Sequence, residues 1–250
     1  METTRFKGRI AVITGAHQGI GRGVAERLGA EGAHVVCLDL EDCAETMTRI
    51  TESGGTAERA TMDVTDLSQW RREIERIDAH HGRIDVLGNI AGVVATTADT
   101  AVDIEQEQWD RMISHDLTSV WYGMKTVLPL MIRNGYGRIL NIASLAALRG
   151  LPNLFSYSAA KAGVTGMTRQ AAVEYAGTGV TINAIAPGTI NTPILADITP
   201  EMLDQFAAAH AIKRLGTPAD IAAMAAYLCS PEADFITGMT YPVDGGWSIV

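Results

Sequence analysis

The sequence predicts an α/β protein with a Rossmann-type, doubly wound parallel sheet of about seven strands and helices on both faces, in a single domain of residues 1–250. Short apolar, β-branched runs alternate with longer segments of helical period, which is typical of repeated βαβ units. Runs such as Ala11-Val12-Ile13 are apolar on both sides, as expected for a sheet that helices cover on both faces. No Pro/Ser-rich linker or block of charge marks a domain boundary.

The expected strands and helices alternate along the chain, with two helices before the last strand. Strands are predicted at residues 9–14, 34–38, 56–62, 84–90, 137–143, 180–186 and 240–242. Helices are predicted at residues 19–30, 42–52, 67–80, 104–134 (with room for a break), 155–176, 200–209 and 219–229. The longest stretch without a strand signal, residues 188–214, predicts a substrate lid near residues 188–212.

The composition excludes several classes of function. The net charge is −9 and no run of Lys or Arg indicates nucleic-acid binding. No apolar run approaches the ~18 residues that cross a bilayer, and the N-terminus has no signal-peptide pattern, so we expect no membrane association. Cys37, Cys43 and Cys229 lack zinc-type spacing. We therefore expect reduced thiols, no metal and a cytoplasmic protein.

Residues 14–21, Thr-Gly-Ala-His-Gln-Gly-Ile-Gly, lie where the first strand turns into the first helix. Gly15 suits the tight turn, Gly19 lets the backbone approach a pyrophosphate, and Gly21 allows close packing of helix and strand. The helix N-terminus offers unpaired N–H groups to the phosphates. The alternative is a structural turn only. The other loop residues expected to border a dinucleotide are His17, Gln18 and Ile20, although His17 also fits an exposed loop position.

Two carboxylates follow the next strands. Asp39 ends the second strand, where it can accept hydrogen bonds from the adenosine ribose and repel a 2′-phosphate, so we expect NAD rather than NADP. Asp63 and Val64 end the third strand and are expected to meet the adenine. Each aspartate also fits an ordinary helix cap.

Tyr157 and Lys161 lie four residues apart on a predicted helix and so share one face. Tyrosine has an ordinary pKa near 10, and a nearby ammonium favours its phenolate. Tyr157 can then take a hydroxyl proton as hydride leaves the carbon. Ser144, at a strand end, can hydrogen-bond the substrate oxygen, or it is simply a turn serine.

Together these motifs resemble the short-chain dehydrogenase/reductase family over essentially the whole chain. The resemblance implies a homotetramer and a contact of Lys161 with the nicotinamide ribose. It also implies that Asn89 ties neighbouring strands together, and that Gly92, beside Ala91, lets the cofactor ribose approach the backbone. The carboxamide of the nicotinamide would lie against Pro187, Gly188, Ile190 and Thr192.

The chain departs from the family pattern at two positions. Ile90 replaces the second Asn of an Asn-Asn-Ala-Gly motif, which removes a local hydrogen bond. Asp116 stands where the family has a catalytic Asn. Because an ionised Asp116 near Lys161 would raise the lysine pKa, we expect activity with a changed pH profile. The alternative is a neutral or solvated helix residue.

The leading hypothesis is an NAD-dependent oxidoreductase that interconverts a secondary alcohol and a ketone by hydride transfer. The apolar residues near 93–96, 145–151, 155 and 188–212 favour an uncharged substrate, with Arg149 as the one cation nearby. An NADPH-dependent reductase of 3-oxoacyl thioesters is the alternative, and Asp39 argues against it. A dinucleotide-binding regulator without turnover has only Asp116 in its favour.

Overall fold

A computed structural model describes residues 4–94 and 99–250. Its centre is a seven-stranded sheet in the order β3-β2-β1-β4-β5-β6-β7, with all neighbouring strands parallel. The fold class predicted from the sequence is thereby confirmed. The strands are β1 Ile10–Thr14, β2 His34–Asp39, β3 Thr56–Thr61, β4 Val86–Asn89, β5 Gly137–Ile142, β6 Val180–Pro187 and β7 Thr240–Val243.

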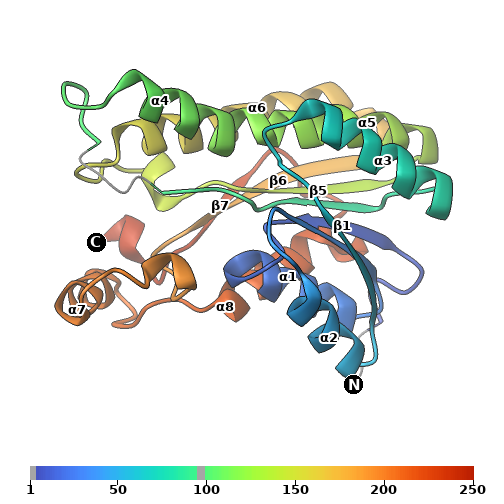
Figure 1. The fold of residues 1–250 in the computed structure, drawn as a ribbon, viewed down its shortest axis with the longest axis horizontal. Coiled ribbons are helices and arrows are strands. Elements are labelled where there is room, and N and C mark those ends of the chain that lie inside the picture. Colours follow the sequence, from blue (N-terminus) through green and yellow to red (C-terminus); the bar gives the residue numbers. More distant parts are fainter. Residues whose placement is uncertain (1–3, 95–98) are drawn as a thin grey trace.

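Helices cover both faces of this sheet (Figure 1). One face carries α3 Leu67–His81, α4 Gln106–Ile113, α5 Ser119–Asn134 and α6 Phe155–Tyr175. The other face carries α1 Gly19–Ala30, α2 Ala44–Glu52 and α8 Pro218–Cys229. Each layer buries its own hydrophobic cluster against the sheet, one around Trp70 and Met131 and one around Phe6 and Leu28. Within the described residues, no helix has the length and apolarity to cross a membrane.

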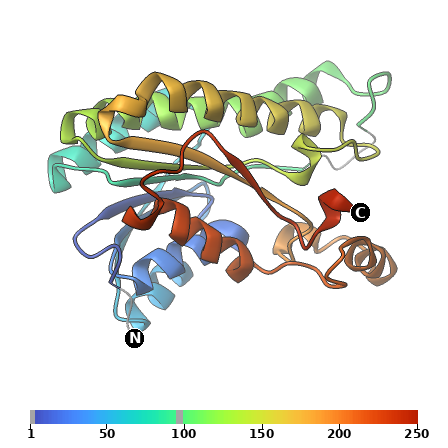
Figure 2. The same ribbon diagram turned by 180° about the vertical axis from the view of Figure 1, so that it is seen from behind.

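Five short 3₁₀ turns complete the helical elements, at Leu145–Ala147, Ala176–Thr178, Pro193–Leu195, Pro231–Ala233 and Trp247–Ile249. The helix α7, Pro200–Ala209, lies beyond the sheet near the C-terminus (Figure 2). It has no buried residue. It is therefore a peripheral element and not part of the core.

The long helix expected over residues 104–134 is interrupted. A π-helical turn, Ser114–Thr118, joins α4 to α5. Such turns occur where a helix takes up one extra residue, and they are frequent at functional sites. Asp116 lies within this turn and is buried, which explains why the break stands at this point of the chain.

The chain leaves β1 toward β2 and β3 and then returns to place β4 on the other side of β1. The carboxyl ends of β1 and β4 therefore face a crevice, which is where ligands bind in sheets of this kind. The side chain of Thr14, at the end of β1, is hydrogen-bonded to β4 and to the residues that follow it. Its buried hydroxyl accepts hydrogen bonds from the N–H groups of Ile90 at 2.9 Å and Ala91 at 3.1 Å, and donates to the Gly88 carbonyl at 3.2 Å.

We expect Thr14→Val to lower the free energy of unfolding by about 2 kcal/mol, because two backbone N–H groups would lose their acceptor. Urea unfolding measures the loss. Thr48→Val is the matched control, since the exposed hydroxyl of Thr48 bonds only to a carbonyl of its own helix α2. Equal losses in both variants would contradict the role of Thr14.

Candidate functional site

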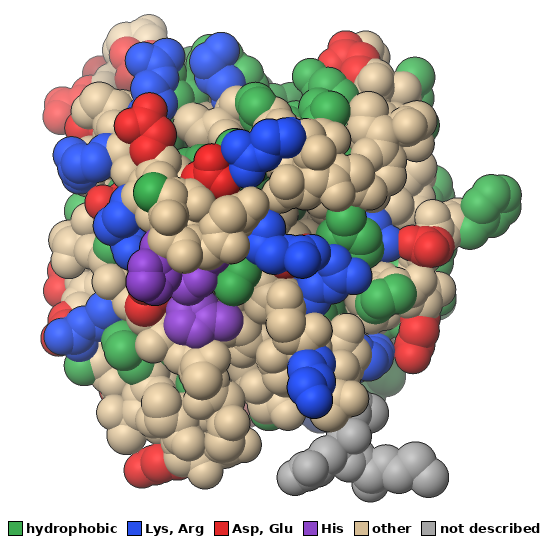
Figure 3. All heavy atoms as spheres, turned by 90° about the vertical axis from the view of Figure 1, so that its right-hand side faces the viewer, with side chains coloured by type: hydrophobic (Ala, Val, Ile, Leu, Met, Phe, Trp, Pro, Cys, Tyr) green, Lys and Arg blue, Asp and Glu red, His purple; other side chains and the backbone are tan. Residues whose placement is uncertain are grey.

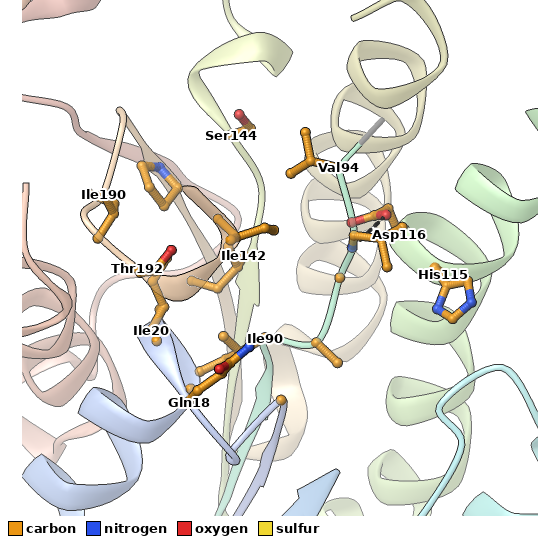
Figure 4. A pocket seen from close by; sticks show the side chains of 18 of the residues that line it. Gln18, Ile20, Ile90, Val94, His115, Asp116, Ile142, Ser144, Ile190 and Thr192 are labelled. Atoms are coloured by element: carbon orange, nitrogen blue, oxygen red, sulfur yellow. Dashed lines mark hydrogen bonds between the residues drawn. The ribbon is translucent and has the colours of Figure 1, made fainter. Parts of the chain in front are cut away.

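A cavity of about 400 Å³ opens at the carboxyl ends of the strands. It brings together residues that lie far apart in the sequence, and Figure 4 shows Ser144, Val94 and Ile142 around its open centre. The sequence-predicted residues that line it are Gly15, Gln18, Gly19, Ile20, Gly21, Asp39, Val64, Ala91, Gly92, Asp116, Ser144, Tyr157, Lys161, Pro187, Gly188, Ile190 and Thr192.

Three predicted residues do not line the cavity. His17 borders a separate surface depression, and its ring Nδ1 lies 2.8 Å from the Asp42 carbonyl. Asp63 uses its carboxylate to accept hydrogen bonds from the N–H and hydroxyl of Thr65. Asn89 is buried behind the crevice and donates to the Asn141 side chain at 2.9 Å. That bond joins β4 to β5, as the resemblance implied for Asn89.

Sequence reasoning missed several lining residues. They are mostly neighbours of predicted ones at strand ends: Leu40, Met62, Ile142 and Ala143, together with His115 from the π turn. Of the positions expected to border the substrate, Val93 and Val94 line the cavity, whereas residues 95 and 96 lie outside the described residues. The expected residues 146–151 and Phe155 line a separate depression instead. The missed strand-end residues could have been predicted, because parallel strands that lie side by side end at the same edge of the sheet.

The glycine-rich loop fits a dinucleotide phosphate. Gly15 and Gly19 have φ angles of +67° and +58°, which favour glycine. A Cβ on Gly21 would collide with the Gly15 carbonyl oxygen, so the close packing of helix and loop requires glycine here. The N-cap residue of α1, Gln18, makes no side-chain capping bond, and the first turn has no acidic residue. This helix end is therefore available to an anion.

Asp39 is fixed at the end of β2 by two backbone hydrogen bonds. One carboxylate oxygen accepts from His17 N at 2.9 Å and the other from Glu41 N at 3.1 Å. The two arginines close to this loop are already paired, Arg22 with Glu45 at 2.9 Å and Arg59 with Asp42. The pocket end beside Asp39 is thus electronegative.

Ser144, Tyr157 and Lys161 meet at one side of the cavity. Ser144 precedes a 3₁₀ turn and its Oγ accepts a hydrogen bond from Ala146 N at 3.1 Å. Tyr157 lies in the first turn of α6, and Lys161 follows one turn later with its Nζ 5.7 Å from the centre of the Tyr157 ring. The ammonium of Lys161 donates to the Ile142 carbonyl at 3.1 Å.

The first turn of α6 is held by Asp99, a residue that no sequence motif singled out. Its buried carboxylate accepts hydrogen bonds from the N–H of Ser156 at 2.9 Å and from the Ser156 hydroxyl at 2.9 Å. This carboxylate takes the place of a side-chain N-cap. The anchored turn sets the position from which Tyr157 enters the cavity.

Asp116 forms an ion pair with Lys161, with 2.9 Å between Oδ1 and Nζ, and both side chains are at most 4% exposed. Its other oxygen accepts from Val93 N at 3.2 Å. Burial lowers the pKa of Lys161, but attraction to Asp116 and Tyr157 and the hydrogen bond to Asp116 together outweigh this, so the net pKa lies above its ordinary value. A Cβ on Gly92 would overlap Oδ1 of Asp116. Asp116 is therefore a paired residue of the site and not a solvated one.

Comparisons with known proteins agree with this geometry. The family model described as Enoyl-(Acyl carrier protein) reductase matches residues 15–248. The chain is 38% identical to 2,5-dichloro-2,5-cyclohexadiene-1,4-diol dehydrogenase LinX of Sphingobium indicum, over 98% of each chain. It is 35% identical to the cyclohexanol dehydrogenase of an Acinetobacter species, over 98% of this chain and 97% of the relative.

The crystal structure of levodione reductase superposes with a TM-score of 0.94 at 33% identity, covering 97% of this chain and 98% of that one. Matches over nearly the full length of both partners show a common family and not only a common fold. The chain belongs to the short-chain dehydrogenase/reductase family, and it is an oxidoreductase that interconverts a secondary alcohol and a ketone by hydride transfer.

Proposed function

We propose that this oxidoreductase uses NAD to oxidise a small, uncharged alicyclic secondary alcohol to its ketone, and catalyses the reverse reduction. The observation that carries the proposal is the character of the cavity beside Ser144 and Tyr157. Its walls there are apolar and include Val93, Val94, Ile142, Ile194 and Leu195. The relatives named above act on cyclic alcohols or diols, which supports the same substrate class.

The charges around the cavity favour an uncharged substrate. Among its described lining residues, Lys161 is the single Lys or Arg, and Asp116 neutralises it. Arg149, the one cation near the expected substrate residues, donates to the backbone carbonyls of Trp247 at 2.6 Å and Val250 at 3.1 Å. A carboxylate or phosphate on the substrate would therefore find no free partner among these residues.

The proposed chemistry assigns one task to each polar side chain. The bound dinucleotide supplies the hydride acceptor for oxidation and the hydride donor for reduction. Tyr157 takes the hydroxyl proton during oxidation and returns it during reduction. Ser144 holds the substrate oxygen by a hydrogen bond, and the ammonium of Lys161 favours the phenolate of Tyr157. Residues 188–195 border the cavity, and we propose that the segment 188–212 covers the substrate from this side.

The two other hypotheses are less well supported. A reductase of 3-oxoacyl thioesters that depends on NADPH would need a partner for the 2′-phosphate, but the Asp39 carboxylate lines this end of the cavity. A regulator without turnover would rest on Asp116. Yet Asp116 lies in the ion pair with Lys161 and does not displace Ser144, Tyr157 or Lys161 from the cavity.

The test is a comparison of initial rates across a substrate panel with NAD and with NADP. Cyclohexanol and cyclic diols represent the proposed class, with linear secondary alcohols, polyols, hydroxy acids and hydroxysteroids beside them. We expect the highest kcat/KM for a cyclic alcohol with NAD. Preference for NADPH and a 3-oxoacyl thioester would overturn the proposal, and NAD binding without any turnover would favour the regulator.

We expect Asp39→Ser to raise kcat/KM with NADP relative to NAD by about ten- to hundredfold, because the variant removes a negative charge that faces the 2′-phosphate. Steady-state kinetics with both cofactors measure the ratio. Glu52→Gln is the control, since Glu52 is an exposed carboxylate at the end of α2 that does not line the cavity. An unchanged ratio in Asp39→Ser would contradict the proposed basis of cofactor choice.

We further propose a homotetramer in the cytoplasm. Large apolar side chains stay exposed on the surface of one chain, among them Trp121, Val173 and Phe235, and such side chains favour contacts between subunits. All three cysteines are free, as suits a reducing compartment. Light scattering would give the tetramer a mass about four times the 26.7 kDa of one chain.

A further inference from the structure

Two histidines and a glutamate meet at the edge of the sheet, away from the catalytic cavity. His34 begins β2, Glu58 lies in the edge strand β3, and His81 ends α3. One potential ligand atom from each residue lies within 4.8 Å of those of the other two. Figure 3 shows histidine side chains gathered in one patch on this face of the molecule, with acidic and basic groups beside them.

The backbone explains why these residues converge. In the parallel pairing of β2 and β3, His34 stands opposite Thr56. Glu58 follows Thr56 by two positions and so lies on the same face of the sheet. The C-terminal end of α3 brings His81 against this face, with 4.8 Å between the ring centres of His34 and His81.

The hydrogen bonds leave ligand atoms available. His34 Nδ1 lies 2.9 Å from the Thr56 hydroxyl. With its proton on Nδ1, the ring donates to this hydroxyl, and Nε2, which has no hydrogen-bond partner among the described residues, keeps its lone pair. A second ring nitrogen held by a polar neighbour is the usual arrangement of a metal-binding histidine.

Glu58 and His81 are already adjacent. Glu58 Oε1 lies 3.3 Å from His81 Nε2. Arg76 lies closer to Glu73, at 2.9 Å, than to Glu58, at 3.4 Å, so it competes only weakly for Glu58.

We propose that His34, Glu58 and His81 form a binding site for a transition-metal dication, with Zn²⁺ as the best match. Two imidazole nitrogens and one carboxylate, completed by water, are a donor set that Zn²⁺ takes in tetrahedral geometry. Ligand atoms around such an ion lie about 3.4 Å apart. The ligand atoms of the three partly buried side chains therefore need to approach one another by up to about 1.4 Å, which rotations of their side-chain bonds supply.

The site is structural and not catalytic. Its residues share no member with the lining of the catalytic cavity, and His34 begins the strand that Asp39 ends. A bound ion would join the end of α3 to the edge strand β3. We therefore expect Zn²⁺ to raise the melting temperature by about 5–10 °C at a hundredfold excess over its dissociation constant. The kcat of the dehydrogenase should stay within about twofold.

The test is calorimetric titration of the chelator-treated full chain with ZnCl₂ at neutral pH. We expect one equivalent to bind, with the affinity at least tenfold lower in His34→Gln and in His81→Gln. The matched control is His80→Gln, because His80 is exposed and adjacent to His81 but does not belong to the cluster. The affinity of the His80→Gln variant for Zn²⁺ should change less than threefold.

One further variant and one spectroscopic probe distinguish the possible results. Thr56→Val should weaken binding about tenfold, because it removes the group that orients His34. The visible spectrum of bound Co²⁺ should show tetrahedral coordination in the unaltered chain and lose it in His34→Gln. The proposal is overturned if no stoichiometric binding occurs, if His34→Gln binds as well as the unaltered chain, or if His80→Gln costs as much as His81→Gln.

Discussion

Tyr157→Phe is expected to lower kcat about a thousandfold while NAD still binds. The variant keeps the aromatic ring but removes the hydroxyl that exchanges a proton with the substrate, and loss of such a group typically costs 10²- to 10⁴-fold. Because Lys161 and Ser144 stay in place, substrate and cofactor should still enter the cavity. Steady-state rates with the best alcohol of the panel give kcat, and calorimetry gives the affinity for NAD.

The matched control for this prediction is Tyr175→Phe. Tyr175 ends the same helix α6 and packs partly buried against the hydrophobic core, far along the helix from the cavity. Its variant should retain activity within about twofold. If Tyr157→Phe kept more than a tenth of the original kcat, another group would have to carry the proton.

Asp116→Asn is expected to move the high-pH limb of the rate profile to lower pH by about one unit or more. In the unaltered chain, burial lowers the pKa of Lys161, and the ion pair with Asp116, together with attraction to Tyr157, more than compensates. The variant keeps the burial and loses the opposite charge, so the pKa of Lys161 falls and the ammonium deprotonates at lower pH. Rates of alcohol oxidation, measured from neutral to strongly alkaline pH, give the position of this high-pH limb.

Asp110→Asn provides the comparison, because Asp110 is an exposed carboxylate on the preceding helix α4 that bonds only to Gln106 in the described contacts. Its profile should match that of the unaltered chain. Superimposable curves for Asp116→Asn would mean that the ion pair does not govern the protonation of Lys161 during turnover.

The sequence predicted the fold and most of the cavity for one physical reason. Strands that alternate with helices form a parallel sheet, and a parallel sheet brings all its strand ends to one edge. Gly15, Asp39, Gly92, Ser144 and Pro187 each follow or end a strand, so their meeting in one cavity follows from the topology. Lys161 joins them because helical spacing places it on the same face as Tyr157.

The features that the sequence did not predict depend on contacts between residues that lie far apart in the chain. His34, Glu58 and His81 are separated by more than twenty residues each and share no motif. The carboxylate of Asp99 caps a helix that begins 56 residues later, at Phe155, so no local signal connects them. Among the described residues, the part of the segment 188–212 that borders the cavity ends at Leu195, so closure of residues 200–209 over the substrate stays a prediction.

The π-helical turn Ser114–Thr118 restricts how the length of the chain can change during evolution. Deleting one residue from this turn would let α4 and α5 run through as one regular helix, with the parts before and after rotated by about 100° relative to each other. Asp116 would then leave Lys161, or α4 would leave its place above the cavity. Removing one residue between Ile113 and Ser119 is therefore expected to disrupt the ion pair of Asp116 with Lys161 as fully as replacing Asp116 itself.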